Sequence, residues 1–453
     1  MMSDQGKLEP SVDATLTDEK SVRDLESGPV ETAKDDKGSV EDAIETPPVA
    51  AQALLNDPPD GGFKAWSAVF GAACGAFATF GYVNAWGVFQ SYYEEQILRD
   101  TSPSTIAWIG SIEYALILAP GLLTGRMFDR GYVRLPISIA SATLVASTFL
   151  TAECKKYWQF LLCQGILAGA SCGIIFGPMM GLTSQWFKRK RGIALGCLAI
   201  GSSVGGTVFP IAARHLIQIV GFKWMMRILG FIQLAALTIT FLTVKRRLPP
   251  SPASTKMFDL NIFKSPAYSI YSLSSLIMFL GLYTVLTFID VSAILSGISP
   301  EFSFYLVSIA NASSGLGRFA GGALADKAGA MNVLIPSSLV AAVLTYAWPF
   351  AKSKGDFVAI AIIYGAFSGV YISLMAAPLM SMGNAGNVGI MVGWTMTILS
   401  AGAIAGPPIS GAINAATKGY KDVGYYAGSM IVLSCLLMSV VRYIRLGKFI
   451  GKI

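Results

Sequence analysis

The sequence predicts an all-α integral membrane protein with twelve transmembrane helices, arranged as two pseudo-symmetric six-helix bundles. Three observations support this fold class. The 453 residues are 53% hydrophobic and only 13% charged, about half the charged fraction of a soluble domain. Apolar stretches of about 20 residues, the length that crosses a bilayer as a helix, recur along most of the chain. Two short motifs also recur about 200 residues apart.

Residues 1–60 differ from the rest of the chain. They contain 15 of the 27 acidic residues, 5 of the 34 basic residues and no aromatic residue. Such a composition cannot bury enough apolar surface to offset the entropy of ordering the chain. We predict a disordered acidic tail on the cytoplasmic side. A passive tail is the first interpretation, and modification of its Lys, Ser and Thr side chains by other enzymes is the alternative.

Twelve apolar stretches follow the tail, and each is long enough to span the membrane. We predict transmembrane helices at residues 66–89, 106–126, 133–151, 158–182, 191–213, 223–244, 266–289, 303–323, 332–351, 357–381, 388–411 and 422–445. Glycine and proline inside several of them do not contradict this assignment, because membrane helices tolerate both.

Lysine and arginine in the connecting loops set the orientation. With the tail in the cytoplasm, the loops on its side carry 18 of these residues and the opposite loops carry 9, as the positive-inside rule requires. The longest internal loop, 245–265, is basic and rich in proline. It divides the chain into a six-helix bundle at 61–244, a cytoplasmic linker and a second bundle at 266–453, with both termini in the cytoplasm.

The two bundles carry matching motifs. Three residues that end the second helix match three that end the eighth, 197 residues later: Gly125, Asp129 and Arg130, and then Gly322, Asp326 and Lys327. Gly-x3-Gly spacings in the fifth and eleventh helices recur at an offset of 201 residues. Two pairs at nearly one offset indicate a duplicated six-helix unit, an architecture of transporters whose substrate site lies between the repeats.

The first of these motifs resembles the signature of the major facilitator superfamily, which has a glycine, an Asp-Arg pair and further basic residues between its second and third helices. The resemblance implies a carrier that works by alternating access. It also implies that both copies of the motif form a gate on the cytoplasmic side, where charged groups pair in one state and separate in the other.

Two further segments resemble the monocarboxylate-transporter family, especially its fungal branch. Residues 60–66 read Asp-Gly-Gly-Phe-Lys-Ala-Trp before the first helix, and residues 186–191 read Trp-Phe-Lys-Arg-Lys-Arg before the fifth. The family implies a proton-linked or facilitative carrier of small organic acids, and its fungal members resemble riboflavin carriers and exporters of secondary metabolites. Asn84 and Ser314 stand where the family's acid carriers have a lysine and an aspartate. This departure favours a larger or neutral polar substrate over lactate.

Two charged residues lie well inside predicted helices, where a charge costs about 2.5 kcal/mol or more and is usually functional. Arg318, in the eighth helix, is predicted to face a central cavity and to hold a carboxylate or enolate by two parallel hydrogen bonds. A fixed pairing with another helix is the alternative. Glu113, in the second helix, is predicted to hold a coupling proton, and a static pairing with a cation is its alternative.

Polar and aromatic residues of the helices around the centre are the predicted lining of the substrate site. The polar candidates are Asn84, Asn311 and Ser314, and the aromatic candidates are Phe80, Tyr283, Tyr371 and Trp394. A flat conjugated substrate can stack on such rings. Core packing or lipid contact is the alternative for most of the rings.

Several functions are excluded by what the sequence lacks. The basic residues form no stripe that nucleic acid would require, and no phosphate-binding Gly-x4-Gly-Lys-Ser/Thr segment occurs. The six cysteines and the single histidine form no metal-ligand spacing. We therefore predict no nucleic-acid partner, no cofactor, no metal and no enzymatic activity.

The predicted function is transport of a small organic acid or conjugated metabolite, as a secondary active carrier coupled to protons or as a facilitative carrier. Export and nutrient uptake, of riboflavin or a monocarboxylate, both remain open, and a non-transporting membrane sensor is the remote alternative. The predicted partners are the substrate, protons and the lipid bilayer. The predicted location is the plasma membrane, with a vacuolar or other organelle membrane as the alternative.

Overall fold

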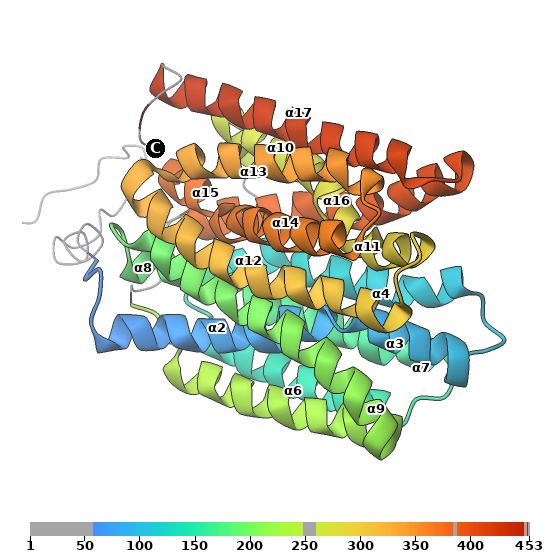
Figure 1. The fold of residues 1–453 in the computed structure, drawn as a ribbon. Helices are drawn as coiled ribbons and strands as arrows, with labels where there is room; N and C mark the ends of the chain where they lie inside the picture. Colours follow the sequence, from blue (N-terminus) through green and yellow to red (C-terminus); the bar gives the residue numbers. More distant parts are fainter. Residues whose placement is uncertain (1–57, 248–259, 384–386, 448–450, 452–453) are drawn as a thin grey trace, which may run out of the picture. The chain divides into compact units, whose positions relative to one another are not determined.

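The computed structural model of the protein describes residues 58–247, 260–383, 387–447 and 451, and every regular element in these ranges is helical (Figure 1). The predicted disordered tail, apart from its last three residues, and most of the predicted linker lie outside these ranges. The side chains of Ser104, Asp129 and Ser184 also lie outside the description, although their backbone is helical.

Ten helical stretches of the described residues are long and apolar enough to cross a membrane. Two further crossings complete the predicted twelve. The 53-residue α9 (Arg191–Thr243) contains two crossings, because its backbone leaves the helical region at Gly221, where φ is 76°. The second additional crossing is α12 (Pro300–Ala328). Its 29 residues have the length of a crossing, although its sequence is more polar than those of the ten apolar stretches.

The first six crossings combine α-helical and π-helical segments. In chain order they are α2 (Phe63–Val83), α3 (Trp86–Tyr92) and η1 (Tyr93–Ile97); α4 (Pro103–Leu118) and α5 (Gly121–Asp129); α6 (Arg134–Thr151); α7 (Tyr157–Phe160), η2 (Leu161–Ala168) and α8 (Gly169–Trp186); and the two parts of α9. The segments η1 and η2 are π-helical, a rare form that frequently occurs at functional sites.

The last six crossings follow the short 3-10 helix η3 (Leu260–Lys264). They are α10 (Pro266–Leu282) and α11 (Thr284–Leu295); α12; α13 (Ala330–Ala347) with η4 (Trp348–Phe350); α14 (Lys354–Leu374) and α15 (Ala377–Met382); α16 (Val388–Thr417); and α17 (Tyr420–Leu446). Local chemistry fixes several starts. Proline stands in the first turn of α10 and α12, where its missing N–H is not needed, and Ser353 and Asp356 form a capping box at α14.

The predicted spans agree with these helices to within a few residues at most ends. The clearest difference is the first span, predicted at 66–89, since the helical stretch continues to Ile97. Its last turn is η1, which carries the charged Glu94 and Glu95. The apolar stretch therefore ends before the helix does.

The two halves of the chain meet through matching helix pairs. The helix α12 packs along α9 (Figure 1), and α16 packs against α4 and α5. These pairs join the fifth crossing to the eighth and the second to the eleventh, as expected for pseudo-symmetric bundles. The predicted all-helical membrane fold of twelve helices is confirmed.

The repeated glycines lie where these helix pairs approach most closely. A Cβ atom at Gly322 in α12 would overlap the carbonyl oxygen of Gly192 in α9. A Cβ atom at Gly125 in α5 would likewise overlap the carbonyl oxygen of Gly389 in α16. Only a residue without a side chain permits such backbone contact between membrane helices.

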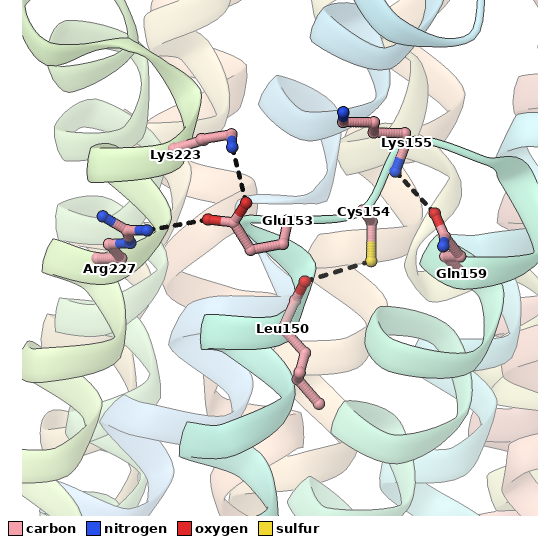
Figure 2. Close-up of polar contacts among 7 residues, drawn as sticks. All are labelled: Leu150, Glu153, Cys154, Lys155, Gln159, Lys223 and Arg227. Carbon is pink, nitrogen blue, oxygen red and sulfur yellow. Dashed lines mark hydrogen bonds and ion pairs between the residues drawn. The ribbon is translucent and has the colours of Figure 1, made fainter.

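An ionic cluster ties the loop after α6 to the second part of α9 (Figure 2). The Glu153 carboxylate accepts hydrogen bonds from Lys223 Nζ at 2.7 Å and Arg227 Nη2 at 2.9 Å. Both contacts are ion pairs between exposed or half-exposed side chains. The hydrogen bond from Lys223, with Arg227 beside it, holds the pKa of the Glu153 carboxyl below its ordinary value.

We expect the Glu153 cluster to make stability depend on pH in the acid range. Because the pKa is lower in the folded state, the stabilisation is fully present above the ordinary value and is lost as pH falls through the folded value. The melting temperature of purified wild-type protein should therefore exceed that of Glu153→Gln by a small margin at neutral pH and converge with it in acid. A margin that persists in acid would contradict this assignment. Glu95→Gln, at an exposed glutamate outside the cluster, is the matched control.

Candidate functional site

A cavity lies between the two halves of the chain, near the middle of the helices that form it. It is lined from α2, α4, α8 and α9 on one side and from α10, α11, α12 and α14 on the other. Its lining includes Phe80, Asn84, Phe176, Ser202, Phe279, Tyr283, Asn311, Ser314, Arg318, Ser368 and Ser373. The cavity measures about 40 Å³, room for only a few water molecules. A metabolite would enter only after the halves separate.

Arg318 is the charged residue of this cavity. Its side chain is 6% exposed, and it is held by the opposite half of the protein. Nη1 donates to the carbonyl oxygen of Ala199 at 2.6 Å and to the hydroxyl of Ser202, both in α9. Nε donates to the Ser314 hydroxyl at 3.1 Å. Arg318 has no carboxylate partner among the described residues, so this buried cation is neutralised by dipoles alone.

Two amide side chains complete the polar part of the lining. Asn311 Nδ2 donates to the carbonyl oxygen of Gly206 in α9 at 3.2 Å, a second bond between the halves. Asn84 caps the end of α2 by donating from Nδ2 to the carbonyl oxygen of Phe80 at 2.6 Å. The carbonyl oxygens of both amides are left as acceptors for a bound molecule.

Aromatic rings form the apolar part of the site. Phe80 packs edge-on against Phe176 with ring centroids 4.6 Å apart. Tyr283 lies 5.2 Å from Tyr114 of α4 in an edge arrangement and 5.5 Å from Phe279. These rings extend on both sides of the cavity that Arg318 lines.

Six of the eight predicted substrate residues line this one cavity, and two do not. Tyr371 is completely buried and packs 6.4 Å from Phe279, behind the lining. Trp394 packs edge-on against Phe263 of η3, 5.5 Å away. Both rings were predicted from helix position alone, which does not distinguish the cavity face from the face toward a neighbouring helix.

Sequence reasoning missed the groups that hold Arg318. Ser202 lies among glycines and small residues in α9, a pattern that predicts helix packing and not a binding role. The signal that could have found it is the packing of the fifth crossing against the eighth, which places α9 opposite Arg318.

Glu113 lies outside the cavity. It is completely buried in α4 and is absent from the cavity lining. Its neighbours are Tyr82 of α2, Tyr93 of η1 and Gln164 of η2, all within the first half of the chain. The next residue, Tyr114, contacts the cavity residue Tyr283, so α4 connects the two regions.

The two segments that resemble the monocarboxylate-transporter family contact each other. The Asp60 carboxylate accepts hydrogen bonds from the backbone N–H groups of Lys188 at 2.6 Å and Arg189 at 2.7 Å. The rings of Trp66 and Phe187 lie 5.0 Å apart. Asp60 thus accepts hydrogen bonds from N–H groups just before α9 that lack a partner within the helix. Its negative charge is also favourable there, because the N-terminal end of a helix is partly positive.

The second copy of the repeated motif contacts the same helix start. The Asp326 carboxylate accepts hydrogen bonds from the N–H groups of Gly192 at 2.6 Å and Ile193 at 2.9 Å, beside the contact between Gly322 and Gly192. Arg130 and Lys327 are exposed. At the opposite end of the α9–α12 pair, the Arg214 guanidinium lies 4.3 Å above the Phe304 ring.

No metal site is indicated in this part of the molecule, because the described residues contain no group of three or more His, Cys, Asp or Glu side chains that could hold an ion. The polar groups of the cavity are instead one guanidinium, two amides and several hydroxyls. This set suits an organic anion with hydrogen-bonding groups.

Comparisons of the sequence with known proteins identify similar membrane transporters. The sequence profile of the Major Facilitator Superfamily matches residues 68–407. The chain is similar to the aspyridones efflux protein apdF of Emericella nidulans, with 34% identity over 404 residues, 88% of this chain and 82% of the relative. It is also similar to the fujikurins efflux protein of Gibberella fujikuroi, with 34% identity over 397 residues, 86% of this chain and 84% of the relative.

Solved structures show the same fold at low sequence identity. The human organic anion transporter MFSD10 has a TM-score of 0.68 at 14% identity, covering 84% of this chain and 100% of that one. The fucose:proton symporter FucP of E. coli has a TM-score of 0.63 at 15% identity, with 82% and 98% covered. The profile covers more than half of the chain, and relatives more than 30% identical span most of it. The chain therefore belongs to the Major Facilitator Superfamily and is a multi-pass membrane transporter of small molecules.

Proposed function

We propose that this transporter exports an organic-acid-like or conjugated metabolite across the plasma membrane. The observation that carries the proposal is Arg318, a cation buried in a membrane helix, in contact with the central cavity and without a carboxylate partner among the described residues. A charge in this position is costly and is typically retained for a ligand or ion. The ligand that matches it is an anion.

The neighbours of Arg318 favour a carboxylate or enolate attached to a flat ring system. A guanidinium presents two parallel N–H groups to such an anion, and Phe80 and Tyr283 offer ring faces and edges for stacking. Without substrate, Ala199 and Ser202 occupy the Arg318 donors. A bound anion would replace these α9 partners and weaken the contact between α9 and α12, which couples binding to movement of the halves.

The names of the relatives support export and a metabolite of this kind. The two described above are named as efflux proteins for aspyridones and fujikurins. Uptake of riboflavin or a monocarboxylate has no comparable support in the structure. The narrower resemblance to monocarboxylate transporters stays a prediction.

We propose that the contacts of Gly125 and Gly322 form the cytoplasmic gate and that this gate is closed here. The Asp326 carboxylate bridges from the C-terminal half to the start of α9, and opening the gate breaks both of its hydrogen bonds. Asp129, Arg130 and Lys327 would belong to the same gate. With this gate on the cytoplasmic side, both termini and the acidic tail, with any modification of it, would also be cytoplasmic. The linker 245–265, between bundles at 61–244 and 266–453, would lie on the same side.

Proton coupling is part of the proposal. Glu113 would bind a proton from outside and release it to the cytoplasm, so that the proton gradient drives metabolite export. Because α4 also carries Tyr114 against Tyr283, a change at Glu113 can reach the substrate cavity through one helix.

A metabolite comparison tests the proposed export. Cells that express the chain and matched cells that lack it are grown together with Arg318→Ala cells, and small molecules are measured inside and outside. We expect at least one aromatic or conjugated acid to accumulate inside the cells that lack the chain, to fall in their medium, and to follow the same pattern in Arg318→Ala. A compound that is instead depleted inside those cells would establish uptake and contradict export.

A further inference from the structure

A second group of polar side chains is sealed inside the first half of the chain, apart from the substrate cavity. It consists of Glu113 in α4, Tyr82 in α2, Gln164 in η2 and Tyr93 in η1, and each of these side chains is 0% exposed. None of them lines the central cavity. Four polar side chains from four segments thus converge in a region outside the lining of the central cavity.

Several atoms of this group lack a hydrogen-bond partner. They are both carboxyl oxygens of Glu113, the hydroxyl of Tyr82 and Nε2 of Gln164. Gln164 and Tyr82 lie close to Glu113, yet no hydrogen bond of ordinary geometry joins them to it. Leaving buried polar atoms unsatisfied is unfavourable, and a molecule lying among these four atoms could partner all of them.

The orientation of Gln164 is fixed by its other end. The Tyr93 hydroxyl donates to Gln164 Oε1 at 2.6 Å, which leaves Nε2 as a donor beside Glu113. Both residues belong to π-helical segments, whose wider turns displace side chains from α-helical positions. The two π-helices therefore place a hydrogen-bond donor next to a buried carboxyl.

No cation faces the Glu113 carboxyl in the described residues. The titratable groups around it are Tyr82 of α2, Tyr93 of η1 and Cys172 of α8. Tyr92 of α3 stacks on Phe222 instead, and α16 contains no titratable side chain. An ionised carboxylate without a facing cation is costly in such a buried place, which favours the neutral, protonated form of Glu113.

We propose that one or two water molecules occupy this site and that the hydrated carboxyl of Glu113 stores the coupling proton there, separately from the substrate. A buried water needs two to four polar partners, and the four unpartnered atoms supply them. The water gives a proton a donor and acceptor beside Glu113 in a sealed space. The role of this site in transport rests on the proposed proton coupling, whereas the existence of the hydrated carboxyl does not.

The hydrated site is tested first without any transport substrate. In infrared difference spectra of the purified full-length protein at neutral pH, the wild type should show the carbonyl band of a protonated carboxyl that Glu113→Gln lacks. Tyr93→Phe keeps the ring that packs 4.3 Å from Phe160 but loses the hydroxyl that orients Gln164, so it should shift this band. Tyr92→Phe, one residue away and outside the network, should leave the band unchanged.

Two results would overturn the site. One is a wild-type spectrum identical to that of Glu113→Gln, which would mean that the carboxyl is ionised. The other is an experimental structure in which Glu113, Tyr82 and Gln164 bond directly to one another with no water between them. Glu113→Gln should also keep its melting temperature within about 2 °C of the wild type, because it replaces one neutral polar group by another. A larger fall would likewise indicate an ionised carboxylate.

The role in coupling is tested with the exported compound from the metabolite comparison. Efflux by Glu113→Gln should no longer depend on external pH, and efflux by Tyr93→Phe should keep a pH dependence with a shifted midpoint. A wild-type pH profile in Glu113→Gln would overturn the proton store while leaving export intact. If no compound responds to the chain at all, export fails, and the spectra still decide whether the hydrated carboxyl exists.

Discussion

Replacing Arg318 by alanine is expected to lower the efflux rate by at least about 100-fold while the protein still reaches the membrane. The clamp would lose two charge-assisted hydrogen bonds to the substrate, each contributing about 1.5–3 kcal/mol, and each 1.4 kcal/mol corresponds to a factor of ten. The measurement is the initial efflux of the identified compound, divided by the amount of transporter in the membrane.

Two further variants separate a substrate clamp from a structural role. Arg318→Lys keeps the charge but loses the two-pronged guanidinium, so we expect an intermediate loss. Ser314→Ala removes only the acceptor of Arg318 Nε and should change the rate by a few-fold at most. Normal efflux by Arg318→Ala, at a normal membrane level, would rule out the clamp.

Replacing Gly322 by valine is expected to lower transport by more than tenfold, by preventing the proposed cytoplasmic gate from closing. The new side chain would overlap the backbone carbonyl of Gly192, and a backbone atom cannot move aside as a flexible side chain can. Overpacking costs about 1–3 kcal/mol or more, which shifts the populations of the open and closed states by about 5–150-fold. The transporter would then remain open at this end.

Cysteine labelling measures that shift directly. In a background whose six native cysteines are replaced by serine, a cysteine is introduced at Ser373 in the cavity lining. A membrane-impermeant thiol reagent applied from the cytoplasmic side should label it faster in Gly322→Val than in the parent. Gly87→Val is the matched control, since a Cβ there meets nothing within 4 Å. Equal labelling and normal efflux would contradict a gate at Gly322.

Most of the fold could be predicted from the sequence because a segment that crosses lipid must be both apolar and helical. The length of an apolar stretch therefore predicts the length of a helix. The span predicted at 133–151 differs by one residue from α6, Arg134–Thr151. Prediction was weaker where a polar segment is nevertheless helical, as in η1, which contains Glu94 and Glu95. The turn at Gly221, by contrast, lies in the gap between the spans predicted at 191–213 and 223–244.

The site could be predicted only in part, because a sequence shows which residues are unusual but not which face of a helix they occupy. Arg318 stands out in the sequence because a charge in a membrane helix is rare, and in the structure it lines the central cavity. Its partners Ala199 and Ser202 are ordinary residues that become significant only through a contact 116–119 residues away in sequence. Glu113 was also singled out, but its separation from the cavity depends on packing that no local pattern encodes.

The polar character of α12 has a consequence for biogenesis. An arginine at the centre of a helix opposes insertion by about 2.5–3.5 kcal/mol on the translocon scale, and α12 lacks the hydropathy of the ten clearly apolar stretches. In the finished protein α9 and α14 cover it. Since α14 is synthesised after α12, we expect α12 to stay near the translocon until its later neighbour emerges. We therefore expect the helix that carries the proposed clamp to enter the bilayer together with its neighbours and not by partitioning on its own.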